Sequence, residues 1–119
     1  MKRVLIIEDT AEIRENVIEL LELRQYLIFA AQDGAEGLQL ALEHQPDVIV
    51  CDVKMPVMNG FELLEALREN EITSGIPFIF ISASAQGADI QRGKMSGASA
   101  YLTKPFNCDD LIQIIEQVS

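Results

Sequence analysis

Four groups of polar residues each follow an apolar stretch of the chain: Glu8–Asp9, Asp52, Ser82 and, after Thr103, Lys104. If these stretches are parallel strands, their carboxyl ends meet at one edge of a sheet, and the polar side chains lie close together there. Three carboxylates at one place repel one another and raise each other's pKa unless a cation joins them. Because carboxylate oxygens are ligands that Mg²⁺ prefers, the pattern predicts a magnesium site.

The other two groups suit the transfer of a phosphoryl group. Lys104 adds a positive charge and Ser82 a hydroxyl donor. Together with a metal ion they can surround the oxygens of a transferring phosphoryl group. A carboxylate beside the metal can act as the nucleophile and form an aspartyl phosphate. Asp52 is the best candidate, because it stands alone at the end of its stretch and a turn follows it.

Each of these residues also has a purely structural interpretation. Glu8 and Asp9 can complement a helix dipole, and Asp52 can form a turn. The hydroxyl of Ser82 can be satisfied by backbone, and Lys104 can be an ordinary surface lysine. The functional interpretation is favoured because all of these residues fall at the ends of predicted strands.

The elements that must position the site alternate along the chain. Five short apolar stretches, rich in β-branched and aromatic residues, predict strands that are buried on both faces of a parallel sheet. Segments with the apolar spacing of helices separate them. The predicted strands are Val4–Ile7, Tyr26–Ala31, Val48–Cys51, Phe78–Ile81 and Ala98–Leu102.

The intervening helices complete an α/β fold. Thr10 or Asp9 is expected to cap the first helix and Asn107 the last. Residues Gln86–Ser96 have a thin apolar stripe with two glycines, yet parallel strands need a crossover there, so we predict a helix. Five βα repeats predict a doubly wound, three-layer sandwich with a parallel five-stranded sheet and helices on both faces.

Length and charge exclude several classes of protein. The 119 residues suit one domain. The net charge of -10 repels phosphate backbones and anionic lipid, so we expect no direct binding to nucleic acid. No apolar run is long enough for a membrane helix, and we expect no membrane association. Cys51 and Cys108 have no metal-type spacing, and a reduced, cytoplasmic chain fits them best.

At these residues the sequence resembles the receiver domain of two-component response regulators, from Lys2 to about Val118. The resemblance implies a chemotaxis-type receiver fold, flavodoxin-like, with strand order 2-1-3-4-5, and one receiver domain over residues 1–119. The segments that carry it are Val4–Asp9, Asp52–Gly60, Ser82–Ala83 and Tyr101–Phe106.

The resemblance also implies roles for the site residues in a phosphorelay. Asp52 would receive a phosphoryl group from a phosphohistidine on a sensor histidine kinase or a histidine phosphotransfer protein. Asp9, Asp52 and the backbone carbonyl of Lys54 would hold Mg²⁺, and Glu8 would act through a metal-bound water. Lys104 would contact the phosphoryl oxygens.

A switch is implied as well. Ser82 would turn towards the phosphate after transfer, and Tyr101 would move inward into the space that Ser82 vacates. The surface around Tyr101 would then meet an output protein, or an output domain absent from this chain. The Lys104–Pro105 bond is expected to be cis. Such a domain is not an enzyme, apart from its own phosphorylation and slow dephosphorylation.

Three other functions are less compatible with these residues. A small Mg²⁺-dependent phosphatase with an aspartyl nucleophile would want a second Asp two residues later, where Lys54 stands. A flavin-binding module would need a hydroxyl- and glycine-rich loop after the first strand, where the chain has the acidic Glu8–Glu12. A degenerate receiver that only docks proteins would not need all five site residues, which are retained.

Overall fold

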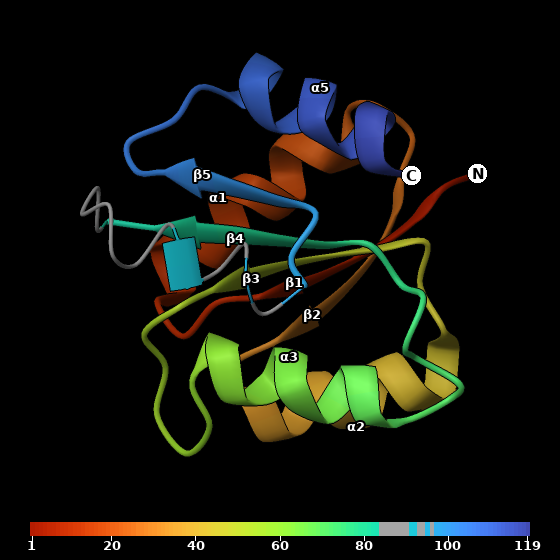
Figure 1. Ribbon diagram of the computed structural model, residues 1–119. Helices are drawn as coiled ribbons and strands as arrows, with labels where there is room; N and C mark the ends of the chain where they lie inside the picture. The colour runs from red at the N-terminus through yellow and green to blue at the C-terminus, as the bar shows by residue number, and fades with distance from the viewer. Residues whose placement is uncertain (84–90, 93–94, 96) are drawn as a thin grey trace.

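The fold is built on one parallel sheet of five strands (Figure 1). The computed structural model describes residues 1–83, 91, 92, 95 and 97–119. The strands lie side by side in the order β2-β1-β3-β4-β5, which confirms the predicted order. In chain order they are β1 (Arg3–Ile7), β2 (Leu27–Ala31), β3 (Val48–Asp52), β4 (Phe78–Ser82) and β5 (Ala100–Thr103).

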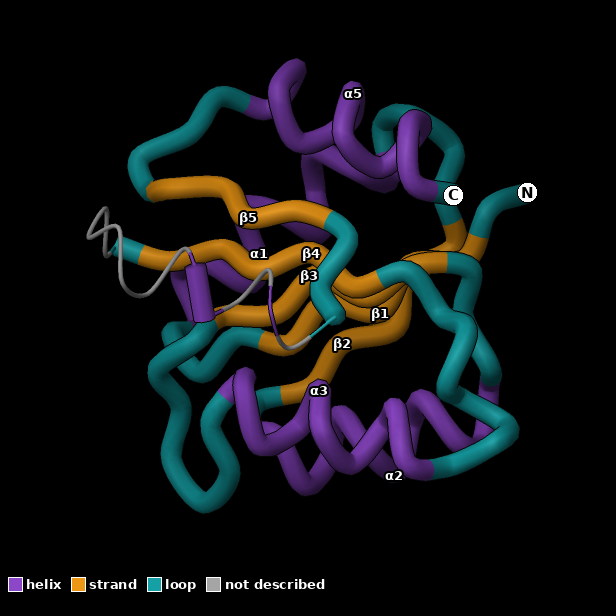
Figure 2. The backbone as a smooth tube through the Cα atoms, in the orientation of Figure 1, coloured by secondary structure: helices purple, strands orange, loops and turns teal. Residues whose placement is uncertain are grey.

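Helices cover both faces of the sheet and make three layers (Figure 2). Helices α1 (Ala11–Glu22) and α5 (Cys108–Val118) pack on one face. Helices α2 (Gly34–His44) and α3 (Gly60–Glu69) pack on the other. The sandwich that the alternating pattern predicts is therefore confirmed.

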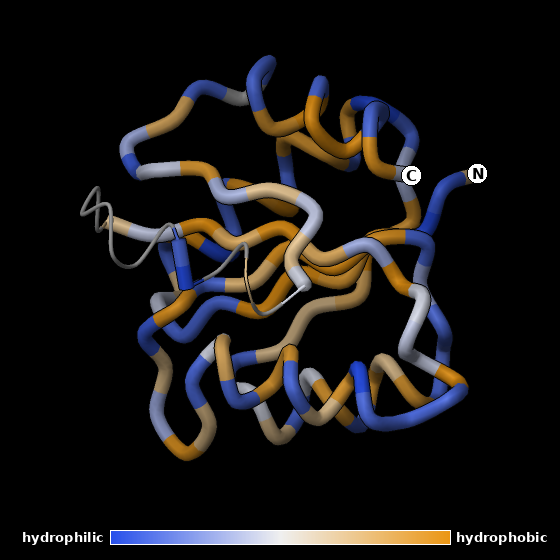
Figure 3. The backbone as a smooth tube through the Cα atoms, in the orientation of Figure 1, coloured by the Kyte–Doolittle hydropathy of each residue, from blue (hydrophilic) through white to orange (hydrophobic). Residues whose placement is uncertain are grey.

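Alternation along the strands supplies both cores. In β1, Leu5 and Ile7 join the cluster beneath α2 and α3, whereas Val4 and Ile6 join the cluster beneath α1 and α5. All four side chains are fully buried. Because both faces of a central strand are covered, every position can be apolar, as the hydropathy colouring shows (Figure 3).

The prediction that all five strands are buried on both faces is wrong for the two outer ones. Strand β2 has exposed residues at Leu27 and Ala30, and every residue of β5 is only partly buried. These strands are the edges of the sheet, so each has a neighbour on one side only. An apolar stretch does not by itself distinguish an edge from a centre.

Side-chain caps set the start of three helices. The side chains of Asp33, Asn59 and Asn107 each accept a backbone N–H from the first turn of α2, α3 and α5. The predicted cap at Asn107 is thus confirmed. Thr10 occupies the cap position of α1, but its side chain makes no capping hydrogen bond, so the expected cap of this helix is wrong.

Two further findings concern helices. The helix predicted over Gln86–Ser96 falls mostly outside the described residues; Gln91, Arg92 and Met95 are described there and are helical. Among the residues that the structure describes, no helix is both long and apolar enough to cross a membrane.

Candidate functional site

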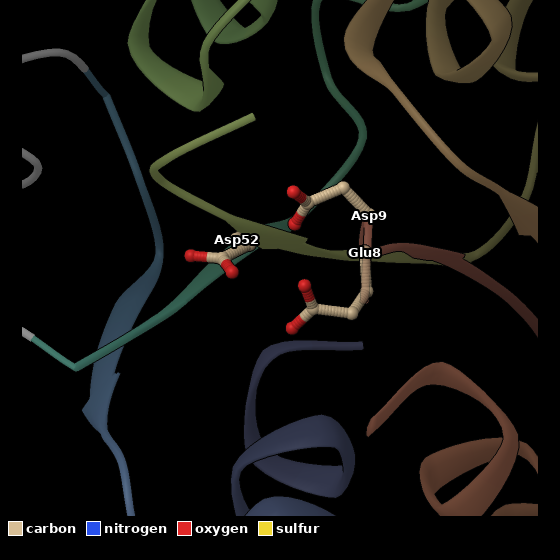
Figure 4. Close-up of side chains that lie close together, drawn as sticks. All are labelled: Glu8, Asp9 and Asp52. Carbon is tan, nitrogen blue, oxygen red and sulfur yellow. The ribbon is translucent and has the colours of Figure 1, made fainter. Parts of the chain in front are cut away.

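The polar residues that follow β1, β3 and β5 meet at one edge of the sheet. The ammonium of Lys104, just beyond β5, lies 2.7 Å from Glu8 Oε1 and 3.0 Å from Asp52 Oδ2. One carboxylate oxygen from each of Glu8, Asp9 and Asp52 lies within 4.8 Å of the others. Figure 4 shows these three side chains at the end of β3 and just beyond the end of β1. The predicted cluster of acids around a lysine is therefore present.

Burial and charge act against each other at Glu8. Its side chain is fully buried, and this burial raises the pKa of the Glu8 carboxyl to about 7. The nearby Asp52 also raises this pKa, whereas Lys104 lowers it. Burial alone would lower the pKa of Lys104, but its hydrogen bonds to the two carboxylates raise it. Lys104 therefore stays charged and partly neutralises the acids.

Asp52 ends the fully buried strand β3, and its side chain is still reachable. The residue is 8% exposed, and its Oδ1 accepts a hydrogen bond from the Lys54 N–H at 3.3 Å. Oδ2 accepts the bond from Lys104. The carboxylate thus has one oxygen oriented by backbone and one by a cation, which holds it towards the edge of the sheet.

A tight turn follows Asp52 and brings the chain back to α3. Val57 has a φ of 70°, in the left-handed region that costs a β-branched residue about 1–2 kcal/mol. Beside it, the Met58 N–H donates to the carbonyl of Pro56 at 2.7 Å. The loop is therefore sharply folded. Asn59 ends it as the N-cap residue of α3.

Gly60 lets this loop close on the backbone of Asp52, a role that the sequence analysis missed. Its N–H donates to the carbonyl of Val53 at 2.8 Å. A Cβ atom at Gly60 would lie 2.6 Å from the backbone oxygen of Asp52 and 2.9 Å from the ring of Phe80. The signal for it in the sequence is the Asn59–Gly60 pair, a dipeptide typical of turns, which stands between a predicted strand and the next helical segment.

Arg14 was also missed. Its Nη1 donates to the backbone carbonyl of Glu8 at 2.8 Å, and the N–H of Thr10 donates to Glu8 Oε2 at 3.3 Å. The sequence offered one hint, because a cation early in a helix opposes the helix dipole and so calls for another partner.

Ser82 and Tyr101 lie on the two strands that follow β3 in the order of the sheet, β4 and β5. Ser82 is buried at the end of β4, and its backbone carbonyl accepts the N–H of Lys104 at 2.6 Å. Tyr101 is half-buried on β5, where its ring centroid lies 5.9 Å from that of Phe80. The Lys104–Pro105 peptide bond is cis, as expected.

The donor set fits Mg²⁺ better than a softer metal. All three candidate ligand atoms are carboxylate oxygens, and Asp9 is exposed while the other two residues are buried. A hard cation with several remaining water positions suits such a set.

Comparison with known proteins agrees with this geometry. The model of the "Response regulator receiver domain" family matches residues 4–116. Protein PilH of Pseudomonas aeruginosa is 35% identical over 118 residues, which cover 99% of this chain and 98% of PilH. The DNA-binding dual master transcriptional regulator RpaA of Synechocystis is 39% identical over 94% of this chain, but the chain spans only 46% of RpaA.

Solved structures give the same result. Chemotaxis protein CheY4 of Vibrio cholerae has a TM-score of 0.94 at 35% identity, with 100% of this chain and 99% of that chain covered. The receiver domain of the Francisella response regulator 1452 has a TM-score of 0.93 at 34% identity, covering 99% of this chain and 96% of that one. The alternative of a small phosphatase is not favoured. The chain belongs to the receiver domain family of the response regulators of two-component signalling.

Proposed function

We propose that residues 1–119 act as one phosphoacceptor domain in which Asp52 receives a phosphoryl group from a phosphohistidine. The donor is a sensor histidine kinase or a histidine phosphotransfer protein. The observation that carries the proposal is the position of Lys104, whose ammonium joins the buried Glu8 and the reachable Asp52 at 2.7 and 3.0 Å. A lysine in that place can neutralise a carboxylate nucleophile and afterwards hold phosphoryl oxygens.

The chemistry follows from the two oxygens of Asp52. One carboxylate oxygen forms a bond to phosphorus while the phosphorus–nitrogen bond of the phosphohistidine breaks, and that electron pair stays on the imidazole nitrogen. Lys104 remains beside the incoming oxygens and offsets their charge.

Receiver domains generally bind Mg²⁺ at an acidic pocket, and the cluster of Glu8, Asp9 and Asp52 fits one. We assign Asp9, Asp52 and the backbone carbonyl of Lys54 as its ligands, with Glu8 acting through a water. The bound ion would shield the negative charge that nucleophile and phosphoryl group share.

A labelling experiment tests the proposal directly. Wild-type protein incubated with radiolabelled acetyl phosphate should gain label that depends on Mg²⁺ and is lost on alkaline treatment, as expected of an acyl phosphate. Asp52→Asn should abolish the label, because the amide is not a nucleophile. Asp109→Asn, an exposed carboxylate paired with Arg24, is the matched control and should label normally. Stable labelling of Asp52→Asn would overturn the proposal.

Ser82 and Tyr101 are proposed to pass the change outward. The added phosphate brings about two negative charges and new acceptor oxygens, which draw the Ser82 hydroxyl inward. Tyr101, half-buried against Phe80, then moves into the vacated space, and the changed surface meets an output protein or a further domain.

The chain has two tyrosines and no tryptophan, so this movement can be followed by fluorescence. In a Tyr26→Phe background, Tyr101 is the only tyrosine. Quenching of its fluorescence by acrylamide should fall on phosphorylation. In the double variant that also carries Ser82→Ala, phosphorylation should leave the quenching unchanged. Unchanged quenching in the phosphorylated Tyr26→Phe protein would exclude the inward movement.

We further propose that the domain is not an enzyme towards other substrates and that it works in the cytoplasm, where its kinase partners would present their phosphohistidines. The wild type should then show no turnover of a small phosphoester such as p-nitrophenyl phosphate under conditions that label Asp52.

A further inference from the structure

Arg14 binds the backbone that links two of the three acids, Glu8 and Asp9. It lies early in α1, is half-buried, and its Nη1 donates to the carbonyl of Glu8 at 2.8 Å. A positive charge near a helix N-terminus is disfavoured by the helix dipole, so the dipole does not explain this placement. The hydrogen bond to the Glu8 carbonyl does.

The rest of Glu8 is already held. Its N–H donates to the carbonyl of Ala31 at 3.1 Å, across the sheet to β2. Its two carboxylate oxygens accept bonds from Lys104 and from the N–H of Thr10. The backbone carbonyl is the remaining polar group, and Arg14 binds it. With this bond, every polar group of the residue has a partner within the protein.

Fixing that carbonyl also orients Asp9. The carbonyl of Glu8 and the N–H of Asp9 belong to one planar peptide unit, so holding the carbonyl sets the plane from which the Asp9 side chain departs. Asp9 is the exposed acid of the three, and no side-chain hydrogen bond of its carboxylate is found among the described contacts. Its direction therefore depends on its backbone.

We propose that Arg14 is a positioning residue for the metal site: it holds the Glu8–Asp9 peptide so that the Asp9 carboxylate stands beside Asp52 to bind Mg²⁺. This inference rests on the proposed function, because it concerns the same site. Arg14 itself is neither a ligand of the metal nor a contact of the phosphoryl group.

The charge of Arg14 has the opposite effect, which makes the proposal testable. A guanidinium bound to the Glu8 carbonyl repels a cation that approaches the neighbouring acids, so removal of its charge by itself tightens Mg²⁺ binding. Loss of positioning weakens Mg²⁺ binding instead. Changes to residues that orient metal ligands typically weaken metal affinity by about 10–100-fold. We therefore expect the positioning effect to exceed the charge effect.

The experiment is calorimetric titration of MgCl₂ into the wild type and into Arg14→Gln, Arg14→Lys and Arg24→Gln, without any phosphodonor. Arg24→Gln is the matched control, since it makes the same charge change just beyond the other end of α1, where Arg24 pairs with Asp109. Arg14→Gln should bind Mg²⁺ about tenfold more weakly than Arg24→Gln. Arg14→Lys keeps the charge but has a shorter reach, and it should fall between Arg14→Gln and the wild type.

A second readout separates positioning from a general structural role. Labelling of Arg14→Gln by acetyl phosphate should be slow at low Mg²⁺ and return to the wild-type rate at saturating Mg²⁺. A lower melting temperature with unchanged Mg²⁺ affinity, or affinity equal to or tighter than that of Arg24→Gln, would overturn the inference. If the wild type itself binds no Mg²⁺, the proposed function fails and the inference fails with it.

Discussion

Lys104 takes the place of a counter-ion when the acidic site holds no metal. Its side chain is largely buried, and it contacts two carboxylates that are more buried still. Breaking a buried ion pair by removing one partner leaves the other charge without compensation. The lysine thus contributes to stability, and this contribution can be measured separately from its proposed part in phosphoryl transfer.

The first prediction concerns Lys104→Met, which keeps the apolar stem and removes the charge. We expect it to lower the free energy of unfolding by about 3 kcal/mol in Mg²⁺-free buffer, because Glu8 and Asp52 then repel each other in a buried site. Addition of Mg²⁺ should recover part of the loss. Urea unfolding followed by circular dichroism measures both effects.

Lys2→Met is the matched control for this prediction. Lys2 pairs with Glu116, more than half of whose side chain is exposed, and such a pair is worth below about 1 kcal/mol. Equal losses in the two variants would show that Lys104 is an ordinary surface partner.

The second prediction follows from the raised pKa of Glu8. Burial first, and Asp52 in addition, raise this pKa from 4.5 to about 7, so between these values the folded protein holds a proton that the unfolded chain releases. By linkage, the contribution of Glu8 to stability is fully present below pH 4.5 and is lost as pH rises through about 7.

Comparison with Glu8→Gln isolates this contribution, because the amide does not titrate. In Mg²⁺-free buffer, the stability of the wild type relative to Glu8→Gln should fall from pH 4.5 to pH 7. Mg²⁺ binding should tighten over the same range, since the cation favours the ionised carboxylate. A difference between the two proteins that does not vary with pH would contradict the assignment.

At the scale of elements, the loop from β3 to α3 depends on one missing side chain. The third prediction is that Gly60→Ala destabilises the protein by about 1–3 kcal/mol. Its new Cβ would lie 2.6 Å from the backbone oxygen of Asp52, so the strand end or the loop must shift. We also expect the Gly60→Ala variant to be phosphorylated at Asp52 more slowly than the wild type, as measured by the initial rate of labelling.

Gly75→Ala provides the control for the same chemical change. Nothing lies within 4 Å of a Cβ placed there. Its stability should stay equal or rise slightly, because alanine restricts the unfolded chain. The interpretation of Gly60 requires a clear difference between the two variants, both in unfolding by urea and in labelling.

The elements also show how far sequence reasoning reaches. Continuous apolar stretches predicted all five strands, and strand ends predicted Glu8, Asp9, Asp52 and Lys104 as neighbours, because topology alone brings those ends together. The partial exposure of β2 was not predicted, since an edge is decided by the neighbours of a strand.

The missed contacts share one property. Arg14 binds a backbone carbonyl, and Gly60 acts through the absence of a Cβ. Neither property depends on a pattern of residue types, so periodicity and motifs do not reveal it. Both residues lie against the backbone of the predicted site. Only the distances between atoms in the structure reveal these contacts.

The whole molecule carries a net charge of -10, and Mg²⁺ therefore acts on it in two ways. Any salt screens the repulsion among surface acids, over a distance of about 8–10 Å at physiological ionic strength. Only a cation that binds at Glu8, Asp9 and Asp52 is linked to folding through a specific site. The two effects must be separated before a stabilisation by Mg²⁺ can be attributed to the site.

The last prediction compares MgCl₂ with NaCl at equal ionic strength. When Mg²⁺ is tenfold above its dissociation constant, specific binding adds about 1.4 kcal/mol, or a rise of about 5 °C in melting temperature for a chain of this size. NaCl should raise the melting temperature less, by screening alone. Asp9→Asn, which removes one proposed ligand, should respond alike to both salts once ionic strength is matched. Equal responses of the wild type to MgCl₂ and NaCl would show that Mg²⁺ acts only on the diffuse charge of the surface, and the acidic cluster would then have to be explained without a metal.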